Sequence, residues 1–391
     1  MQPPLAPYLV GLGRASPRLA LCAAALLAVA SPAAAEWSEV IENRTFPTGL
    51  VLDGRSDVLI RNCQFSNPTA GNGLSIVNCC RIRVENCVIR RVGREELLNQ
   101  PPRKVGDHEF HPVSLHAVHG VLLQDSTQVT LIGNDITDVM GVGLSAYMSY
   151  ERMDEDAGLL IEKNRVAYTF DDGIDFSVKG GPRDPDIRPN LRGVTIRQNL
   201  IHDIGLGLSS LTFARHGMYL SVRDAVVEEN TIYNCFYGEG ISVRNSGIIR
   251  GNRIRNCARA CIGVWAQGRT AGSSGELLIE GNICRQDFAI NLPMRHVAQP
   301  ERIHTLPLAG IVIQHRTRPE VAMKRITVRR NEVLIRPDYA LPVPLLGGSG
   351  SPKGATTELV IAENTLTDQR APKVYFGNLP ADLAAQNRLL P

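Results

Sequence analysis

A short motif recurs along the chain: an apolar residue, two further residues, an Asn, and another apolar residue within two positions. Its clear copies are LIGNDI, IEKNRV, IRQNLI, VEENTI, IRGNRI, IEGNIC, VRRNEV and IAENTL, with Asn at 134, 164, 199, 230, 252, 282, 331 and 364. LIRNCQF and RVENCVI, with Asn62 and Asn86, are weaker copies. Repeats of this length indicate a solenoid, in which each repeat packs only on its neighbours.

A second pattern lies between the Asn positions, where a Gly starts a short apolar-x-apolar segment. These glycines are at 73, 120, 143, 173, 217, 240 and 310. A period of two predicts a strand, so each repeat contains two or three short strands. Stacked repeats of this kind predict an all-β, right-handed parallel β-helix of about ten coils, from near Thr45 to near Phe376. Its core would contain Ile174, Phe176, Met218, Leu220, Ile241 and Val243.

An Asn at a fixed turn position can take the left-handed conformation and bond to backbone groups of the next coil. The alternative all-β architecture, a β-sandwich, predicts hairpin signals and no fixed Asn register, which is the opposite of the observed pattern. The chain has 391 residues, 35 of them Gly, and only 5% are aromatic. That composition suits short strands and tight turns.

Residues 1–35 resemble an export signal. Arg14 and Arg18 precede the apolar run 19–30, and three alanines precede Glu36. The run is too short to span a bilayer, and Leu21 before Cys22 is too bulky for lipoprotein cleavage. We therefore expect a single domain over residues 36–391, periplasmic or secreted, with no membrane span in the mature chain.

Eight cysteines remain after cleavage. Cys63 and Cys87 each follow an Asn in the same register, as do Cys235 and Cys257. Each pair should stack on successive coils, where two outcomes stay open: a disulfide or a ladder of buried thiols. No CxxC pair suggests a zinc site.

Five inserts interrupt the repeat, near residues 94–118, 149–158, 179–192, 294–308 and 336–356. Long loops on a regular scaffold usually carry function. Most of them follow a Gly-headed strand, so several should wall one face of the solenoid.

Three Gly-headed segments are rich in charge: YTFDDGIDFSVKGG, FARHGMYLSVRD and FYGEGISVRN. Superposition on the Gly places Asp172, His216 and Glu239 in one column. Further columns contain Asp175, Tyr219 and Ser242, then Ser177, Ser221 and Arg244, and Asp171 lies over Arg215. On neighbouring parallel strands these side chains would be roughly 4.8 Å apart. A base, an acid, cations and carboxylates would then share one patch of surface.

With these residues the chain resembles the pectate-lyase-like β-helix superfamily. Tyr168-Thr169-Phe170-Asp171 and Arg215-His216-Gly217 resemble the active-site motifs of mannuronan C5-epimerases and related alginate lyases. By position, the resemblance makes Tyr168, Asp171, Arg215 and His216 active-site residues. The family carries Pro-His after that Asp, whereas this chain has Asp172-Gly173. Calcium accompanies many of these relatives, so the resemblance also allows a calcium ion here.

Uronate polymers carry a weakly acidic proton at C5, beside the carboxylate. Its removal needs a base, a cation for the carboxylate and an acid. His216 suits the base near neutral pH, Tyr219 or Tyr168 the acid, and Arg215 and Arg244 carboxylate binding. Asp171 or Asp172 would orient His216 or hydrogen-bond the substrate carboxylate. Substrate-binding candidates are Asp175, Glu239, Arg244, Lys179 and Trp265.

Structural roles remain open for the same residues. The Asp172–His216–Glu239 column could be a surface hydrogen-bond ladder, and Arg215 with Asp171 a structural ion pair. Clustered carboxylates at 171, 172, 175 and 239 could instead hold Ca²⁺. Histidines 108, 111, 116 and 119 could chelate a transition metal.

The sequence therefore predicts an exported, polysaccharide-active enzyme that abstracts the C5 proton of an acidic glycan, as a lyase or C5-epimerase. The alternatives are an inverting glycoside hydrolase and a non-catalytic β-helix that binds glycan or metal. A net charge of +3 is too small to argue for nucleic acid as a partner. We expect a monomer.

Overall fold

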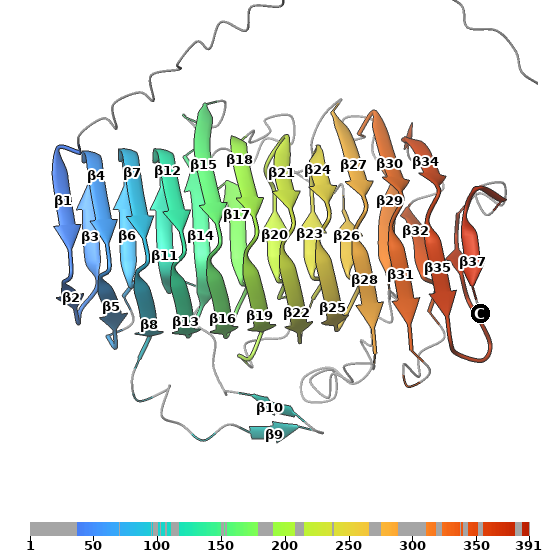
Figure 1. Ribbon diagram of the computed structural model, residues 1–391, viewed down its shortest axis with the longest axis horizontal. Helices are drawn as coiled ribbons and strands as arrows, with labels where there is room; N and C mark the ends of the chain where they lie inside the picture. The colour runs from blue at the N-terminus through green and yellow to red at the C-terminus, as the bar shows by residue number, and fades with distance from the viewer. Residues whose placement is uncertain are drawn as a thin grey trace, which may run out of the picture. The chain divides into compact units, whose positions relative to one another are not determined.

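Each repeat forms one coil of three strands, and equivalent strands of successive coils pair in parallel to build three long sheets (Figure 1). The computed structural model describes residues 37–69, 71–94, 96, 101, 103–105, 108–110, 117–149, 152, 155–178, 191–207, 215–236, 238–265, 275–287, 310–317, 323–336, 338, 343–350, 355–379 and 385–390. Residues from Trp37 to Pro391 make one compact unit. The expected signal segment 1–35 lies outside the described residues.

We name the sheets by their order within a coil. Sheet A contains β1 (Glu39–Glu42), β4 (Ser56–Arg61), β7 (Cys80–Glu85), β12 (Thr127–Ile132), β15 (Asp156–Glu162), β18 (Arg192–Arg197), β21 (Ala225–Glu228), β24 (Gly247–Arg250), β27 (Glu276–Glu280), β30 (Arg325–Arg329) and β34 (Glu358–Ala362). Sheet B contains β2 (Thr45–Phe46), β5 (Gln64–Asn67), β8 (Val88–Val92), β13 (Asp135–Val139), β16 (Arg165–Thr169), β19 (Leu200–Ile204), β22 (Thr231–Cys235), β25 (Arg253–Cys257), β28 (Ile283–Gln286), β31 (Glu332–Ile335), β35 (Thr365–Asp368) and β37 (Arg388–Leu390).

Sheet C contains β3 (Leu50–Asp53), β6 (Leu74–Val77), β11 (His119–Gln124), β14 (Val142–Met148), β17 (Ile174–Val178), β20 (Met218–Leu220), β23 (Ile241–Val243), β26 (Ile262–Val264), β29 (Ile311–Thr317), β32 (Leu346–Gly350) and β36 (Phe376–Gly377). The short β33 (Ala355–Thr356) pairs antiparallel with β29. Outside the coils, β9 (Arg103–Val105) and β10 (His108–Phe110) form a hairpin. The expected all-β parallel β-helix is confirmed, and sheet A has 11 strands.

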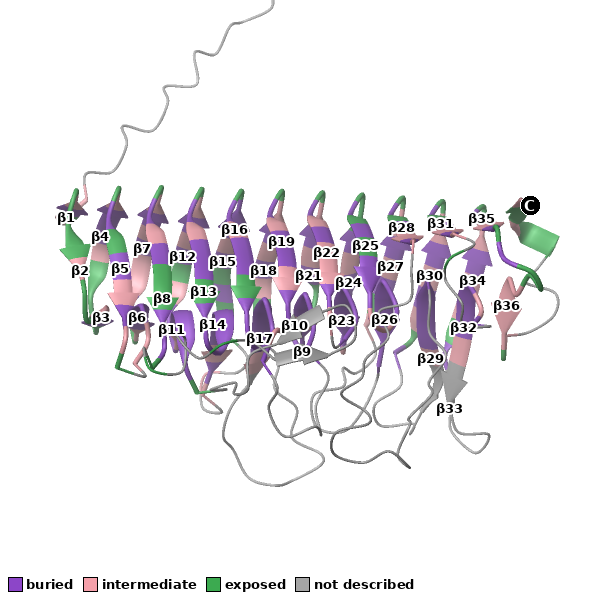
Figure 2. Cartoon of the chain, turned by 90° about the horizontal axis from the view of Figure 1, so that it is seen from below, coloured by how far each residue is buried: buried purple, intermediate pink, exposed green. Residues whose placement is uncertain are grey.

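The core fills the space enclosed by the three sheets (Figure 2). All six apolar residues expected there, at 174, 176, 218, 220, 241 and 243, are buried. Because side chains alternate along a strand, the residues between them point outward. This alternation places Asp175, Tyr219 and Ser242 on the outer face of sheet C.

The Asn repeat forms a continuous ladder at the turn between sheets A and B. Asn230 shows the pattern: its Nδ2 donates to Oδ1 of Asn252 at 2.9 Å and to the Ile196 carbonyl at 2.9 Å, while its Oδ1 accepts from Nδ2 of Asn199 at 2.9 Å. The ladder runs through Asn at 134, 164, 199, 230, 252, 282, 331, 364 and 387. Each amide satisfies buried backbone groups.

Two details of this turn differ from the expectation. The left-handed conformation is taken by the residue before the Asn, such as Lys163 (φ 55°) before Asn164 and Glu229 (φ 57°) before Asn230. In the two weak copies it is Asn62 and Asn86 themselves that are left-handed. There Cys63 and Cys87 occupy the ladder position: the Cys87 backbone N–H donates to Asn134, and that of Cys63 to Sγ of Cys87.

The cysteines from position 63 onward are free thiols in the structure, so the ladder of thiols is the arrangement observed. Cys235 and Cys257 do lie side by side, on β22 and β25.

Some insert boundaries differ from the expected ones. Strand β15 begins within the expected insert 149–158 and belongs to sheet A, and β32 and β33 lie within 336–356 and belong to sheet C. The insert 294–308 lies outside the described residues.

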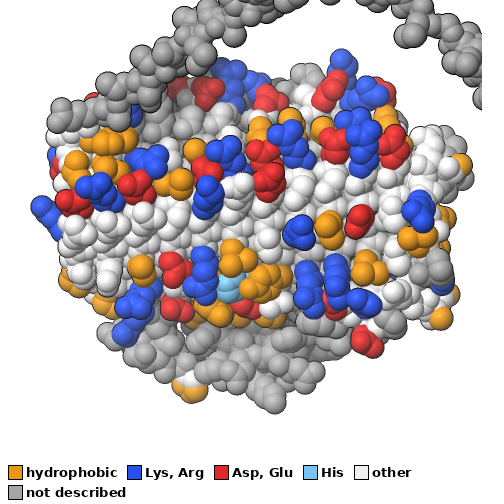
Figure 3. All heavy atoms as spheres, in the orientation of Figure 1, with side chains coloured by type: hydrophobic (Ala, Val, Ile, Leu, Met, Phe, Trp, Pro, Cys, Tyr) orange, Lys and Arg blue, Asp and Glu red, His pale blue; other side chains and the backbone are white. Residues whose placement is uncertain are grey.

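Charged residues form a second ladder at the end of the sheet A strands. Successive rungs carry alternating signs at Glu162, Arg197, Glu228, Arg250, Glu280 and Arg329. Figure 3 shows this pattern as neighbouring blue and red side chains in the upper half of the molecule. Opposite charges on adjacent strands favour this register by a few tenths of a kcal/mol to about 1 kcal/mol a pair.

Candidate active site

The turn from sheet B to sheet C is where the coils approach most closely. A Cβ added to Gly217 would lie 2.6 Å from the Gly240 carbonyl oxygen, and one added to Gly173 would lie 2.6 Å from that of Gly217. Only Gly fits such an approach. The residue before each of these glycines is therefore held at a fixed place, one coil from its equivalent.

Those preceding residues are Asp172, His216 and Glu239, and they stack as expected. The backbone N–H of Gly173 donates to the His216 carbonyl at 3.0 Å, and that of Gly217 to the Glu239 carbonyl at 3.0 Å. The second column is confirmed as well, because Asp175 pairs with Tyr219 and Tyr219 with Ser242. Three coils thus bring these six side chains to one patch, which we call the candidate patch.

His216 and Glu239 form the central pair of the patch. Oε2 of Glu239 lies 2.5 Å from Nδ1 of His216. The backbone N–H of Glu239 also points at Nδ1, at 3.1 Å. We assign the proton to Nδ1 because the nearer group is a carboxylate, which leaves Nε2 as a base.

Burial and charge set the protonation of this pair. Burial lowers the pKa of His216, and Glu239 opposes that shift. Burial alone would raise the pKa of Glu239, but the charge and hydrogen bond of His216, followed by Arg259 and Arg244, lower this pKa to about 2. Glu239 is fully buried, so it positions His216 and does not present its carboxylate to solvent.

Two aspartates on the first coil take different partners. The Arg215 guanidinium pairs with Asp171, so Arg215 is partly neutralised. Asp172 accepts a hydrogen bond from the backbone N–H of His216. Burial, and then the charges of Asp171 and Asp175, raise the pKa of Asp172 well above its ordinary value. Asp172 is therefore a carboxyl group of the patch whose environment favours the neutral form.

Tyr219 and Arg244 lie at the exposed side of the patch, where both are half-buried. The Tyr219 ring lies 5.6 Å from the His216 ring, and the Arg244 guanidinium lies over the Tyr219 ring at 4.9 Å. A base, a phenol and a cation thus adjoin one another. Ser221 Oγ, Ser242 Oγ and Trp265 Nε1 are buried and have no hydrogen-bond partner among the described residues.

Arg259 is a member of the patch that the sequence patterns missed. It lies 3.3 Å from Oε1 of Glu239 and 5.9 Å from the Trp265 ring. In the two preceding coils the equivalent strand N–H bonds to a Gly carbonyl, whereas the Ile241 N–H bonds to the Cys261 carbonyl. Cys261 therefore takes the place of the Gly that begins the other segments. An alignment anchored on Gly therefore omits this coil. The Asn ladder, counted onward from Asn252, would have located it.

Trp265 and Tyr168 are placed differently from each other. Trp265 is buried, and a Cβ on Gly263 would lie 2.5 Å from its Nε1 and 2.8 Å from Cγ of Glu239. Trp265 thus borders the patch. Tyr168 is 40% exposed on sheet B, where its ring lies 5.5 Å from that of His202 and 5.7 Å from the Arg165 guanidinium. The structure does not bring Tyr168 together with His216, and Lys179 lies outside the described residues.

The expected calcium and histidine sites stay predictions. Within the ranges that the structure describes, no group of three or more His, Cys, Asp or Glu residues is arranged to hold a metal ion. Asp171 faces Arg215, and Glu239 faces His216 and Arg259. Two of the four carboxylates of the expected calcium site are therefore already paired. His119 is buried against Asn72, and His111 and His116 lie outside the described residues.

In the described part of the chain, no helix has both the length and the apolar character needed to cross a membrane.

A family model described as the right handed beta helix region matches residues 38–204 and, in an overlapping second match, residues 119–283. No curated protein matches the chain.

Several solved structures are similar in fold. The alginate lyase from Paenibacillus sp. str. FPU-7 has a TM-score of 0.42 and 12% identity, over 90% of this chain and 99% of the lyase. The A-module of the Azotobacter vinelandii mannuronan C-5 epimerase AlgE4 has a TM-score of 0.36 and 9% identity, over 90% and 87%. The Dettilon tailspike protein has a TM-score of 0.44 and 15% identity over 89% of this chain. The chain spans only 63% of that tailspike.

Proposed function

The chain belongs to the right-handed β-helix family, and on that premise we propose that it is an exported enzyme that abstracts the C5 proton of an acidic polysaccharide. The observation that carries this proposal is the His216–Glu239 pair. Its contact of 2.5 Å leaves Nε2 of His216 unprotonated, beside the Tyr219 ring and the Arg244 guanidinium. Base, acid and carboxylate-binding cation are the three groups that this reaction needs.

The patch supports a definite sequence of bond changes. His216 Nε2 takes the proton from C5, and the electron pair of that C–H bond moves toward the neighbouring carboxylate. Arg244 stabilises the negative charge that develops there, as a guanidinium can do through two parallel hydrogen bonds. Protonated Asp172 donates a further hydrogen bond to the same carboxylate.

Tyr219 then supplies a proton, and its destination decides the product. Delivered to the glycosidic oxygen as the C4–O bond breaks, the proton completes an elimination and leaves an unsaturated sugar. Delivered to C5 on the opposite face, it inverts that centre. The enzyme is a lyase in the first case and an epimerase in the second. Glu239 and Arg259 are positioning residues in both.

An inverting hydrolase would need two carboxyl groups facing a water molecule. Asp171 and Glu239 are occupied by ion pairs with Arg215, His216 and Arg259. Asp172 accepts a hydrogen bond from the His216 backbone N–H, and burial, followed by the charges of Asp171 and Asp175, raises its pKa. The contacts therefore favour proton abstraction at C5 over hydrolysis.

Assays on a panel of uronate polymers test the proposal. A lyase produces an ultraviolet-absorbing unsaturated end, and an epimerase exchanges C5 hydrogen for deuterium without cleavage. A hydrolase produces reducing ends without that absorbance, and a binding protein does none of these. We expect His216→Ala to abolish turnover while circular dichroism shows the β-helix intact. Turnover retained by this variant would refute His216 as the base.

A further inference from the structure

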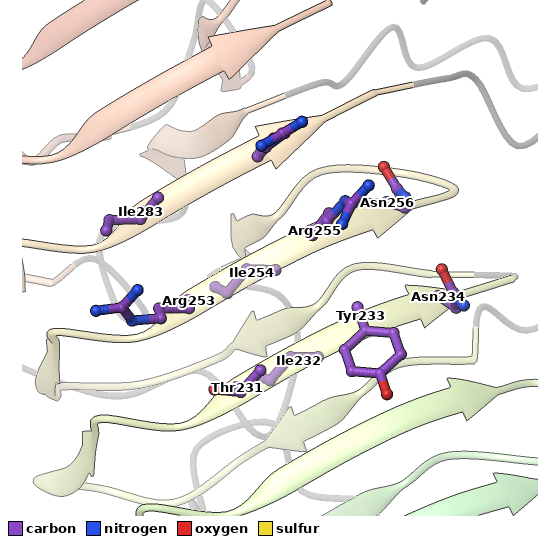
Figure 4. A pocket seen from close by; sticks show the side chains of 10 residues that line it. Thr231, Ile232, Tyr233, Asn234, Arg253, Ile254, Arg255, Asn256 and Ile283 are labelled. Atoms are coloured by element: carbon purple, nitrogen blue, oxygen red, sulfur yellow. The ribbon is translucent and has the colours of Figure 1, made fainter.

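A cavity lies on sheet B, away from the candidate patch. Its volume is about 540 Å³, and it is lined by residues of β22, β25 and β28 (Figure 4). Tyr233, Arg253, Arg255 and Arg285 are among its lining residues. We call this cavity the sheet B groove. Nothing in the proposed reaction uses it.

The charge of the sheet B groove departs from the pattern on the rest of the solenoid. Three of its ten lining residues are arginines and none is acidic. Arg255 and Arg285 occupy the same column on adjacent strands, whereas the sheet A ladder alternates in sign. Like charges directly opposite each other are destabilising. Figure 3, drawn in the orientation of Figure 1, shows Lys and Arg side chains gathered in the lower half of the molecule.

One carboxylate partly offsets this charge. Asp287 lies 2.5 Å from Nε of Arg285 and also pairs with Arg255. Arg336 is a third cation near the same carboxylate, at 3.8 Å. Arg253 is also exposed and lies two residues before Arg255 on β25, so both side chains are on the outer face. The guanidinium groups therefore outnumber the acid, and an anionic ligand would complete the balance.

The aromatic side of the sheet B groove is supported by contacts with neighbouring side chains. The Tyr233 ring stacks on the His202 ring at 4.8 Å with an interplanar angle of 7°. His202 is held in turn by Asp203, 2.6 Å from its Nδ1. A fixed phenol ring beside guanidinium groups suits a sugar acid, which offers apolar ring faces and a carboxylate together.

The same coils build the sheet B groove and the candidate patch. Tyr233 and Glu239 lie in one coil, and Arg255 and Arg259 lie in the next. A polymer chain that follows these coils around the turn from sheet B to sheet C would contact both surfaces. A polyuronate fits best, because each of its units carries one carboxylate.

We propose that the sheet B groove is a second, non-catalytic site that binds a stretch of acidic glycan through Arg253, Arg255 and Arg285. This inference rests on the proposed function, since the glycan is the substrate class assigned there. Guanidinium groups bind carboxylates bidentately, so each arginine would hold one uronate. The site would raise affinity for long chains over short ones by allowing two contacts at once.

Binding measured without turnover tests the site. In the His216→Ala background, the variant pair Arg255→Gln and Arg285→Gln is titrated with fluorescently labelled long polyuronates. We expect Kd to rise about tenfold, a change of one decade in affinity. Arg250→Gln with Arg329→Gln removes the same charge from sheet A and should change Kd less than about twofold. Arg253→Gln, at an exposed position, is a second test that leaves the Asp287 ion pairs in place.

The outcomes separate this site from the proposed reaction. An unchanged Kd in both sheet B groove variants would overturn the proposal. An equal loss of affinity for single-stranded DNA of matched charge would overturn its assignment to a glycan. Groove-dependent binding of polyuronate by a full chain that transforms no uronate polymer would support the sheet B groove and refute the catalytic role of His216.

Discussion

Oε2 of Glu239 lies 2.5 Å from Nδ1 of His216, and the two residues come from adjacent coils. Each directly precedes a Gly whose missing side chain allows the coils to stack closely. The pair therefore depends on the repeat itself. Replacement of either glycine by Ala would separate the two side chains.

Glu239→Gln should lower kcat by about 10⁴-fold, the loss known when a carboxylate that orients a catalytic imidazole is replaced by an amide. The amide would allow the wrong tautomer, with the proton on Nε2. Steady-state rates across pH measure this effect, and Glu239→Asp should recover part of it. A Glu239→Gln enzyme with the wild-type rate would show that Nδ1 needs no carboxylate.

Asp172→Asn should stabilise the protein near neutral pH. The pKa of Asp172 in the folded chain is raised above 3.8, first by burial and then by Asp171 and Asp175. Below pH 3.8 the carboxyl is protonated in both the folded and the unfolded state, so its contribution to stability is fully present. As pH rises, the unfolded chain releases this proton and the folded chain retains it, so the wild type loses stability.

Thermal unfolding at about pH 4 and about pH 7 measures the difference in Tm between Asp172→Asn and the wild type. We expect that difference to grow with pH. The Asn side chain can still donate to a substrate carboxylate, so this variant should retain more activity than Asp172→Ala. A Tm gain that is the same at both pH values would contradict a raised pKa.

Tyr219→Phe should reduce kcat by about 10²–10⁴-fold, the usual contribution of a general acid, while substrate still binds. The matched control is Tyr168→Phe, because that ring contacts His202 and Arg165 on sheet B. Steady-state kinetics on the active polymer compare the two. If Tyr168→Phe instead causes the large loss, the acid has been assigned to the wrong residue.

Asn230→Ala should lower the free energy of unfolding by about 2–5 kcal/mol, because it leaves several buried donors and acceptors on two coils unpaired. Asn387→Ala at the end of the ladder should have a smaller effect, because Asn387 is only part-buried whereas Asn230 is fully buried. Urea unfolding of both variants gives the comparison. Equal losses would mean that burial of the amide does not set the size of the effect.

Periodicity predicted the solenoid, its core and the first two columns of the patch, because a parallel β-helix repeats the same local geometry in each coil. The prediction failed where a residue type was used as the marker of a position. Cys63 and Cys87 take the ladder place that Asn holds elsewhere, and Cys261 takes the place of a Gly. Because Cys261 replaces the Gly, an alignment anchored on Gly omitted the coil that contains Arg259.

Spacing alone therefore determined that Asp172, His216 and Glu239 would be neighbours, since their registry follows from the repeat. The tertiary structure decided which residue each charged group contacts. Glu239 became a buried partner of His216, Asp172 a buried carboxyl group with a raised pKa, and Tyr168 a residue of another sheet, because burial, side-chain direction and the corner between two sheets are set by all the coils together.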